Sequence, residues 1–265
     1  MEVGLKIYLI SLEEDVERRT KLLNNFPVNY KKMEWVKAVN GKKLNAKDYF
    51  SYVQEYFSSH QKVITPGEIG CTLSHIKALE AFLSTEEQFC LILEDDVQGQ
   101  DKDIEKLTVF FSNTNLRGVF LLRDQNNFGY EKYIFGKKRS DFYEIPKFSI
   151  KFMFGACSYI VDRESARAIL SHHDLNFEIA DLWYKILDNS KTNFYYSPIF
   201  IHPKDLSDSN IEDERANFYI NEKNFFKRVY KQGVFWKISN RISNDFCSFI
   251  LFFKGYKHIH RDGTK

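Results

Sequence analysis

The stretch that decides the fold is FCLILEDDV at residues 89–97, where an apolar run leads directly into three acids. Residues 89–93 have the length and composition of a strand that is buried on both faces. A buried strand does not continue into three carboxylates, so the chain must reach a surface or a cleft at Glu94. In an open α/β sheet, the carboxyl ends of the strands form the edge where ligands bind.

The three acids, Glu94, Asp95 and Asp96, indicate a cation site. Carboxylates gathered at one sheet edge repel one another unless a cation lies among them, and Mg²⁺ and Mn²⁺ take oxygen ligands. One interpretation is therefore a metal site that receives a diphosphate. The other is a turn before a helix with solvated acids, and the tripeptide alone leaves both interpretations open.

Length and composition set the broad class of the protein. The 265 residues suit one large α/β domain, or one domain with an appendage. The four cysteines contain no Cys-x-x-Cys pair, which predicts buried free thiols in a reducing compartment. The first residues lack a basic segment followed by a long apolar one, so we expect no signal peptide.

The order of the elements predicts the fold class. Strand patterns alternate with helical patterns along most of the chain, which is typical of a mixed, mostly parallel sheet flanked by helices. The expected strands are 6–12, 35–39, 89–93, 119–122, 148–154, 158–161 and 194–201, and the expected helices are 13–25, 44–59, 66–83, 101–113, 164–170 and 179–187. Ser11 with Glu14, and Thr65 with Glu68, fit capping boxes at two helix starts. No Gly-rich loop follows the first strand, which excludes a dinucleotide fingerprint and a P-loop there.

Three segments, taken in order, closely resemble glycosyltransferase family 25, the lipooligosaccharide-type galactosyltransferases of Gram-negative bacteria. They are IYLISL at 7–12 with Arg18 and Arg19, PGEIGCTLSH at 66–75, and LILEDDV at 91–97. The resemblance covers about residues 5–210 and leaves the tail uncovered. It implies a Rossmann-like GT-A fold, a nucleotide-sugar donor (typically UDP-galactose), a divalent metal (Mn²⁺ or Mg²⁺) and inversion at the anomeric carbon. We therefore expect a GT-A domain over residues 1–210 and a helical, basic-aromatic appendage over 211–265.

The resemblance also implies roles for the acids and for one histidine. In GT-A enzymes the last acid of such a motif typically binds the metal, so Asp96 is the first candidate ligand. His202 follows the strand at 194–201, where some GT-A enzymes have a third ligand; the alternative is a surface histidine in a Pro-bounded loop. Glu94 and Asp95 are candidates for binding the donor, although three successive side chains cannot all face one way.

Further candidates for binding the nucleotide-sugar donor are three arginines and one histidine. Arg18 and Arg19 present forked hydrogen-bond donors suited to phosphate, or else they are a solvated helix face. His75 is a candidate for contact with the donor, and the alternative is a structural helix histidine. Arg123, at a strand end, is a candidate for contact with the donor sugar. Sugar transfer with inversion needs a general base, for which Asp181 is the candidate; the alternative is an acid stabilised by a helix dipole.

The tail differs in charge from the rest of the chain. Residues 221–265 contain ten Lys/Arg and three Asp/Glu, a balance of +7, which leaves −5 for residues 1–220. Ile242, Phe246, Phe249/Ile250 and Phe253 would share one helical face. Basic-aromatic helices suit an anionic membrane surface, while the alternative is a helix packed on the domain. No recognition motif supports nucleic acid as a partner.

Together these features predict a cytoplasmic hexosyltransferase, most simply a galactosyltransferase, peripheral on the inner face of the cytoplasmic membrane. It would use a UDP-sugar donor and a lipid-linked oligosaccharide acceptor in lipopolysaccharide biosynthesis. Two alternatives stay open. One is another metal-dependent phosphoryl or nucleotidyl transferase using the same acids, and the other is a non-catalytic, membrane-docked adaptor on the same fold.

Overall fold

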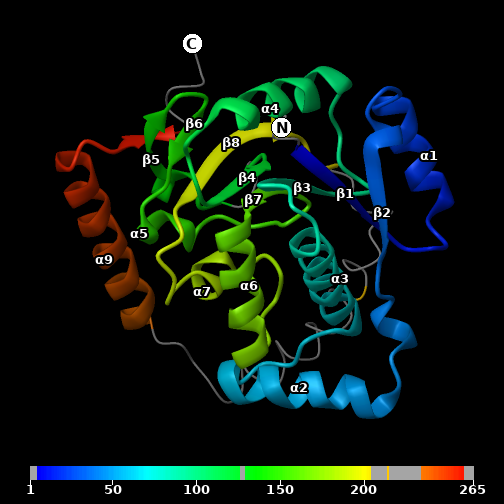
Figure 1. The fold of residues 1–265 in the computed structure, drawn as a ribbon. Coiled ribbons are helices and arrows are strands. Elements are labelled where there is room, and N and C mark those ends of the chain that lie inside the picture. The colour runs from blue at the N-terminus through cyan, green and yellow to red at the C-terminus, as the bar shows by residue number, and fades with distance from the viewer. Residues whose placement is uncertain (1–4, 126–128, 204–213, 215–233, 260–265) are drawn as a thin grey trace.

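The structure is a computed structural model that describes residues 5–125, 129–203, 214 and 234–259, with side chains from residue 240 onward in the last range. Its centre is a nine-stranded sheet in the order β2-β1-β3-β7-β4-β8-β6-β5-β9 (Figure 1). Six strands run in one direction: β1 (Leu5–Ser11), β2 (Met33–Lys37), β3 (Phe89–Glu94), β4 (Val119–Arg123), β5 (Phe135–Arg139) and β8 (Phe194–Phe200). Three run against them: β6 (Phe142–Glu144), β7 (Ser158–Asp162) and β9 (Lys257–His258). This confirms the predicted Rossmann-like GT-A sheet.

Helices cover both faces of the sheet, and strand alternation explains why. In β1, Tyr8 and Ile10 belong to the core beneath α3 (Pro66–Leu83), α6 (Arg163–Leu175) and α7 (Trp183–Ile186). Ile7 and Leu9 point the other way, into the core beneath α1 (Val16–Asn25) and α4 (Asp101–Asn113). The remaining elements are α2 (Ala46–His60), α5 (Lys147–Ile150), α9 (Val234–Phe253) and the single turns η1 (Tyr30–Lys32), η2 (Gly41–Lys43) and η3 (Glu131–Tyr133).

The PGEIGCTLSH segment forms the start of α3 as predicted. The amide of Glu68 donates to the Thr65 hydroxyl at 3.2 Å, and the amide of Thr65 donates to the Glu68 carboxylate at 3.0 Å. Gly70 lies where α3 crosses the η2 turn, because a Cβ on it would lie 2.5 Å from the carbonyl oxygen of Val39. The second glycine of the segment therefore allows the close approach that seats α3 beside the end of β2.

Two local expectations are wrong. Ser11 and Glu14 do not form a capping box: α1 begins at Val16, Ser11 ends β1, and Glu14 instead accepts from Asn40 at 2.7 Å. Residues 148–154 are not a strand, because the segment after Pro146 turns into the short helix α5. A short apolar run does not by itself distinguish a strand from a buried helical turn.

The end of the chain is helical and contributes to the sheet. α9 is a 20-residue helix, and β9 after it pairs with β5 through Phe135 and His258. Ile259 is buried in the core. The predicted division at residue 210 lies outside the described residues and stays a prediction. Within the described ranges, no helix is long and apolar enough to cross a membrane.

Candidate functional site

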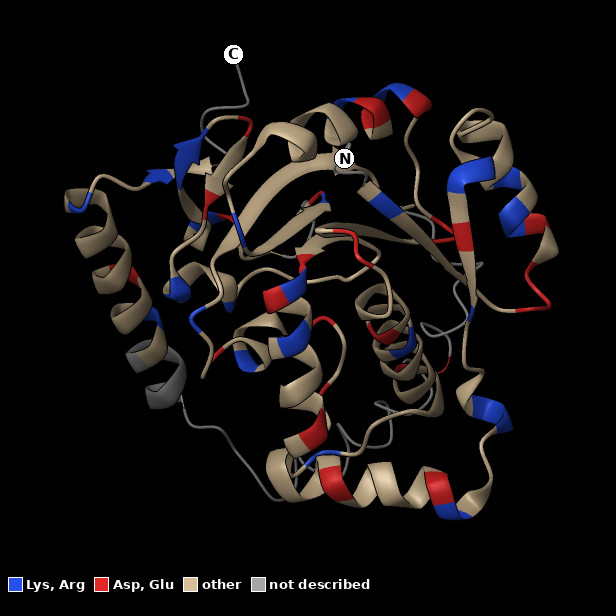
Figure 2. Ribbon diagram, viewed as in Figure 1, with Lys and Arg blue, Asp and Glu red and all other residues tan. Residues whose placement is uncertain are grey.

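The site lies at the edge where β1, β3, β4 and β8 end and the antiparallel β7 begins. Strand pairing aligns Ile10 with Glu94, and Arg123 with Phe200. A bridge between Gln98 and Ile201 ties the turn after β3 to the end of β8. Figure 2 shows the turn after β3 as an acidic segment at the centre of the molecule. This arrangement brings His202 to Asp96, although 106 residues separate them in the chain.

Arg18 is the cation among the acids. Its Nη2 lies 2.8 Å from an oxygen of Asp95 and 2.7 Å from an oxygen of Asp96, while its Nη1 lies 3.7 Å from Asp15. The Nε2 atom of His202 lies 3.3 Å from the same Asp96 oxygen. Arg18 comes from α1, the two acids follow β3, and His202 follows β8, so three segments converge on one charged cluster.

Burial and charge set the protonation of this cluster. Burial raises the pKa of Asp95 to about 7, against the opposing effects of Arg18 and of a hydrogen bond from Ser11. Burial alone would raise the pKa of Asp96 and lower that of His202. Their mutual hydrogen bond and attraction reverse both directions, so the pKa of Asp96 is lowered and that of His202 is raised. The neighbouring acids likewise raise the pKa of Arg18 although burial lowers it.

Asp95 should therefore make stability depend on pH in an unusual direction. Its pKa rises from an ordinary 3.8 to about 7 on folding, so its contribution is fully present below pH 3.8 and lost as pH rises through 7. Asp95→Asn does not titrate at this position. As the pH rises from 4 to 8, its free energy of unfolding should therefore increase relative to that of wild type, by at most about 4 kcal/mol. Urea unfolding across this range in EDTA measures the difference, and a difference that does not change with pH would contradict the assignment.

Glu94 faces away from Arg18. Its Oε1 lies 3.2 Å from Nε2 of His75, and Nδ1 of His75 lies 3.1 Å from the Tyr159 hydroxyl. The three successive acids thus divide between two neighbours: Asp95 and Asp96 contact Arg18, and Glu94 contacts His75. His75 is 4% exposed, so contact with a donor would have to pass through Glu94.

Arg123 and Asp181 meet at Gly155. Gly155 has a φ of +87°, and a Cβ there would overlap the guanidinium of Arg123. Its amide donates to a carboxylate oxygen of Asp181 at 3.3 Å, while its carbonyl accepts from the Trp183 indole at 3.0 Å. One glycine therefore makes room for a predicted donor-binding arginine and orients the predicted base.

The model of glycosyltransferase family 25 (LPS biosynthesis protein) matches residues 5–183. The chain belongs to glycosyltransferase family 25. The match includes the acids after β3, Arg18, His75, Arg123 and Asp181, and it ends before His202.

Three relatives of this chain are animal proteins. A glycosyltransferase 25 family member of Anopheles gambiae is 28% identical over 183 residues, covering 64% of this chain and 29% of the relative. Procollagen galactosyltransferase 2 of Homo sapiens is 24% identical over 178 residues, covering 62% and 27%. Inactive glycosyltransferase 25 family member 3 of Mus musculus is 29% identical over 103 residues, covering 36% and 17%. The chain thus spans less than a third of the length of each of these relatives.

The donor set fits the divalent metal that the family resemblance implies. Oδ1 of Asp96 is buried and has no hydrogen-bond partner among the residues that the structure describes, which is costly unless a cation or donor completes it. A carboxylate with a neighbouring imidazole is a ligand set suited to Mn²⁺. Asp96 and His202 are therefore the residues that would hold the metal.

Arg19, a predicted donor-binding residue, contacts the turn between β1 and α1 in the structure. Its guanidinium donates to the Ser11 hydroxyl at 2.8 Å, to the Glu13 carbonyl at 2.9 Å and to the Leu12 carbonyl, and it stacks 4.4 Å from the Trp35 ring. These contacts hold the turn between β1 and α1 and favour its structural interpretation. The turn in turn positions Arg18.

Sequence reasoning missed Gly155 and Tyr159 as supports of the site. Gly155 stands just before a predicted strand, and an isolated glycine there was a signal for close backbone approach. Tyr159 gave no signal, because its contact with His75 joins residues 84 positions apart. Glu178, three residues before the predicted base, is 2% exposed and its carboxylate lies 2.7 Å from Nε2 of His60, which favours a structural role.

Proposed function

We propose that this chain is an inverting glycosyltransferase that moves a hexose, most simply galactose, from a UDP-sugar to an acceptor hydroxyl. The observation that carries the proposal is the cluster of Arg18, Asp95, Asp96 and His202 at the edge of the sheet. Within the described ranges, one buried oxygen of Asp96 has no partner. Galactose is supported by the family resemblance and by the name of the human procollagen galactosyltransferase.

Each residue has a distinct task in this proposal. Mn²⁺ or Mg²⁺, held by Asp96 and His202, would neutralise charge on the departing UDP. Arg18 keeps the two acids in place, and Arg123 binds the donor phosphates or sugar through its forked donors. Glu94, held by His75, binds the donor ribose.

Asp181 is the proposed base, which takes the proton of the acceptor hydroxyl as the anomeric carbon is attacked. We expect Asp181→Asn to lower transfer by about 10²–10⁴-fold, because an amide cannot accept that proton. The Kd for UDP should stay within about twofold, since Asp181 does not bind the diphosphate. Kinetics and calorimetry measure the two effects, with the exposed Asp174→Asn on α6 as control. Equal losses of UDP binding and transfer would assign Asp181 to the donor site instead.

The test of the activity is release of UDP from a panel of UDP-sugars, with Mn²⁺ and with EDTA, in the absence of acceptor. Slow, metal-dependent hydrolysis of one sugar nucleotide would identify the donor and support the acidic cluster as its site. If no donor is hydrolysed, titration with UDP and Mn²⁺ separates the remaining cases. Binding would indicate strict dependence on an acceptor, and no binding would overturn the proposal.

The proposed acceptor is a lipid-linked oligosaccharide on the cytoplasmic face of a membrane, as the bacterial resemblance implies. The name of the human relative points to a collagen-like polypeptide as the competing acceptor. Transfer from the donor identified above to each acceptor, compared side by side, distinguishes the two.

The exposed face of α9 is the proposed membrane contact. Ile242, Phe246, Phe249, Phe252 and Phe253 are each at least 60% exposed, and Figure 2 shows few charges along this helix. The helix is anchored to the domain by Lys151, which donates to Asn244 at 2.9 Å, by Tyr133, which donates to Asp245 at 3.2 Å, and by the buried Leu251. An apolar helix face in a segment whose sequence, residues 221–265, has a net charge of +7 suits an anionic bilayer.

Substitution of that face should release the protein from membranes. We expect Phe246→Ser with Phe249→Ser to lower co-sedimentation with phosphatidylglycerol vesicles about tenfold or more, because it removes two exposed aromatic rings that would enter the bilayer. Point variants are used because removing the tail would also remove β9 and the buried Ile259. Val109→Ser, at an exposed apolar position on α4, is the matched control. Unchanged sedimentation of the double variant would rule out α9 as the contact.

The non-catalytic adaptor is the second candidate, because the mouse relative is named an inactive family member. It predicts UDP binding without turnover when metal, acceptor and lipid are all present. Any turnover that Asp96→Asn abolishes would exclude it.

A further inference from the structure

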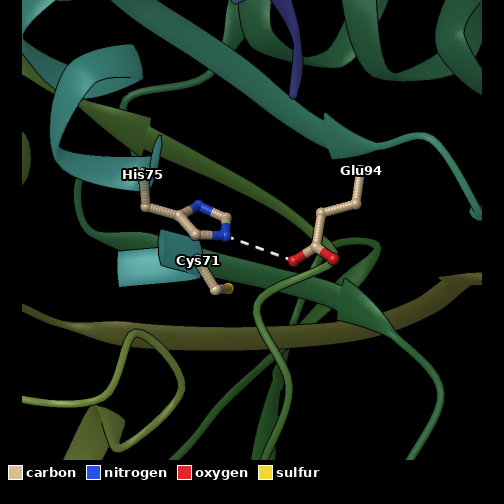
Figure 3. A group of neighbouring side chains, drawn as sticks. All are labelled: Cys71, His75 and Glu94. Atoms are coloured by element: carbon tan, nitrogen blue, oxygen red, sulfur yellow. Dashed lines mark hydrogen bonds and ion pairs between the residues drawn. The ribbon is translucent and has the colours of Figure 1, made fainter. Parts of the chain in front are cut away.

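A second group of metal-ligating side chains lies next to the charged cluster. It consists of Cys71 and His75 from α3 and Glu94 from the end of β3, and the three side chains converge in Figure 3. One ligand atom of each lies within 4.8 Å of the others. Within the described part of the chain, this is the one such group of three, and it contains a thiol that the proposed transfer reaction does not use.

The sequence places these ligands by simple rules. Cys71 and His75 are four residues apart on α3, so they share one face of the helix. The capping box at Thr65 and the close contact of Gly70 with the η2 turn fix the start of α3. Glu94 is the last residue of β3, whose side chain turns toward this face while Asp95 and Asp96 turn toward Arg18.

The spacing of His75 and Glu94 matches that of two ligands in a tetrahedral zinc site. Zn²⁺ binds nitrogen and oxygen at about 2.0–2.1 Å, so two such ligands in a tetrahedron lie about 3.4 Å apart. Nε2 of His75 and Oε1 of Glu94 are 3.2 Å apart and are held there by a hydrogen bond. A metal between them would therefore need little movement of these two atoms, with the imidazole proton moving to Nδ1, where the Tyr159 hydroxyl can accept it.

The surroundings of His75 are those of a metal ligand. Metal-bound histidines usually have their second ring nitrogen held by a hydrogen-bond partner, which sets the direction of the ring. Here Nδ1 of His75 is 3.1 Å from the hydroxyl of Tyr159, and both side chains are buried. Nε2 then faces Glu94, on the side where Cys71 lies.

We infer that Cys71, His75 and Glu94 bind a thiophilic divalent cation, Zn²⁺ in type, with a fourth position for water. Thiolate and imidazole select Zn²⁺ over Mg²⁺ and Mn²⁺, which prefer oxygen ligands. Binding releases the thiol proton of Cys71 to solvent as the sulfur becomes a ligand. The site is separate from the pair of Asp96 and His202, which offers no sulfur, and Glu94 adjoins both.

Cobalt titration of the untagged, full-length protein tests the inference through a spectrum and does not depend on turnover. Under anaerobic conditions, Co²⁺ bound to a thiolate gives a near-ultraviolet charge-transfer band that oxygen and nitrogen ligands alone do not give. We expect the absorbance of this band to saturate at one equivalent of Co²⁺ per chain, and one equivalent of Zn²⁺ to abolish it. Asp96→Asn should keep the band, which separates failure here from failure of the proposed transferase site.

Cysteine variants identify the sulfur. Cys71→Ser should lose the band, whereas Cys247→Ser, at a half-buried cysteine on α9, should keep it. Circular dichroism checks folding, and Cys71→Ala replaces the serine variant if that one does not fold. Absence of the band in wild type, or its persistence in a folded Cys71 variant, would overturn the inference.

Discussion

Asp96→Asn should lower metal-dependent release of UDP by about 10³-fold, which corresponds to about 4 kcal/mol of transition-state stabilisation. The substitution removes the anionic ligand whose buried Oδ1 has no partner in the described part of the chain, and it weakens the contact with His202. An amide of the same shape should leave the sheet edge intact. Initial rates with saturating Mn²⁺, beside a thermal unfolding curve, measure both expectations.

The control for this experiment is Asp174→Asn, which makes the same carboxylate-to-amide change at an exposed aspartate on α6. It should keep wild-type rates. Wild-type activity in folded Asp96→Asn would show that the acidic cluster does not take part in the reaction. If Asp96→Asn does not fold, binding of UDP and Mn²⁺ is measured on Asp96→Glu instead. This variant keeps a carboxylate and should bind both more weakly than wild type.

Arg18→Gln should be the most destabilising change in the site. Arg18 is the shared partner of Asp95, which is 6% exposed, and of Asp96. Removing one partner of a buried ion pair typically costs about 3–5 kcal/mol, because the remaining charge is left without compensation. We expect a loss of this order at pH 8, measured by urea unfolding in EDTA.

The same loss should be smaller at pH 5. Arg18 acts to lower the pKa of Asp95, so without it the carboxyl holds its proton to still higher pH. At pH 5 Asp95 is neutral in both proteins, and the missing guanidinium matters less. Arg167→Gln, at an exposed arginine of α6, is the matched control. An equal loss at both pH values would show that Arg18 acts through packing and not through the charge of Asp95.

Local patterns were sufficient for much of the fold. The apolar run at 89–93 is β3, and the Thr65 capping box starts α3 as predicted. These succeed because burial and capping depend on residues a few positions apart. The capping box at Ser11 failed because Ser11 stays in the sheet beside Trp35, whose indole donates to its carbonyl at 3.0 Å. A tertiary contact thus outweighed the local preference.

The sequence by itself determined that a buried strand ends in three acids, that a capped helix carries Cys71 and His75 on one face, and that the chain belongs with family 25. Only the tertiary structure decided which of those acids contact Arg18 and which contacts His75, because the regular alternation of side chains along a strand is lost in the turn after it. It also decided that Arg18 and His202 meet Asp96 and that Glu94 meets Cys71 and His75. These contacts join residues 19–106 positions apart. Sheet order and strand register set such distances, and neither is encoded in any single segment.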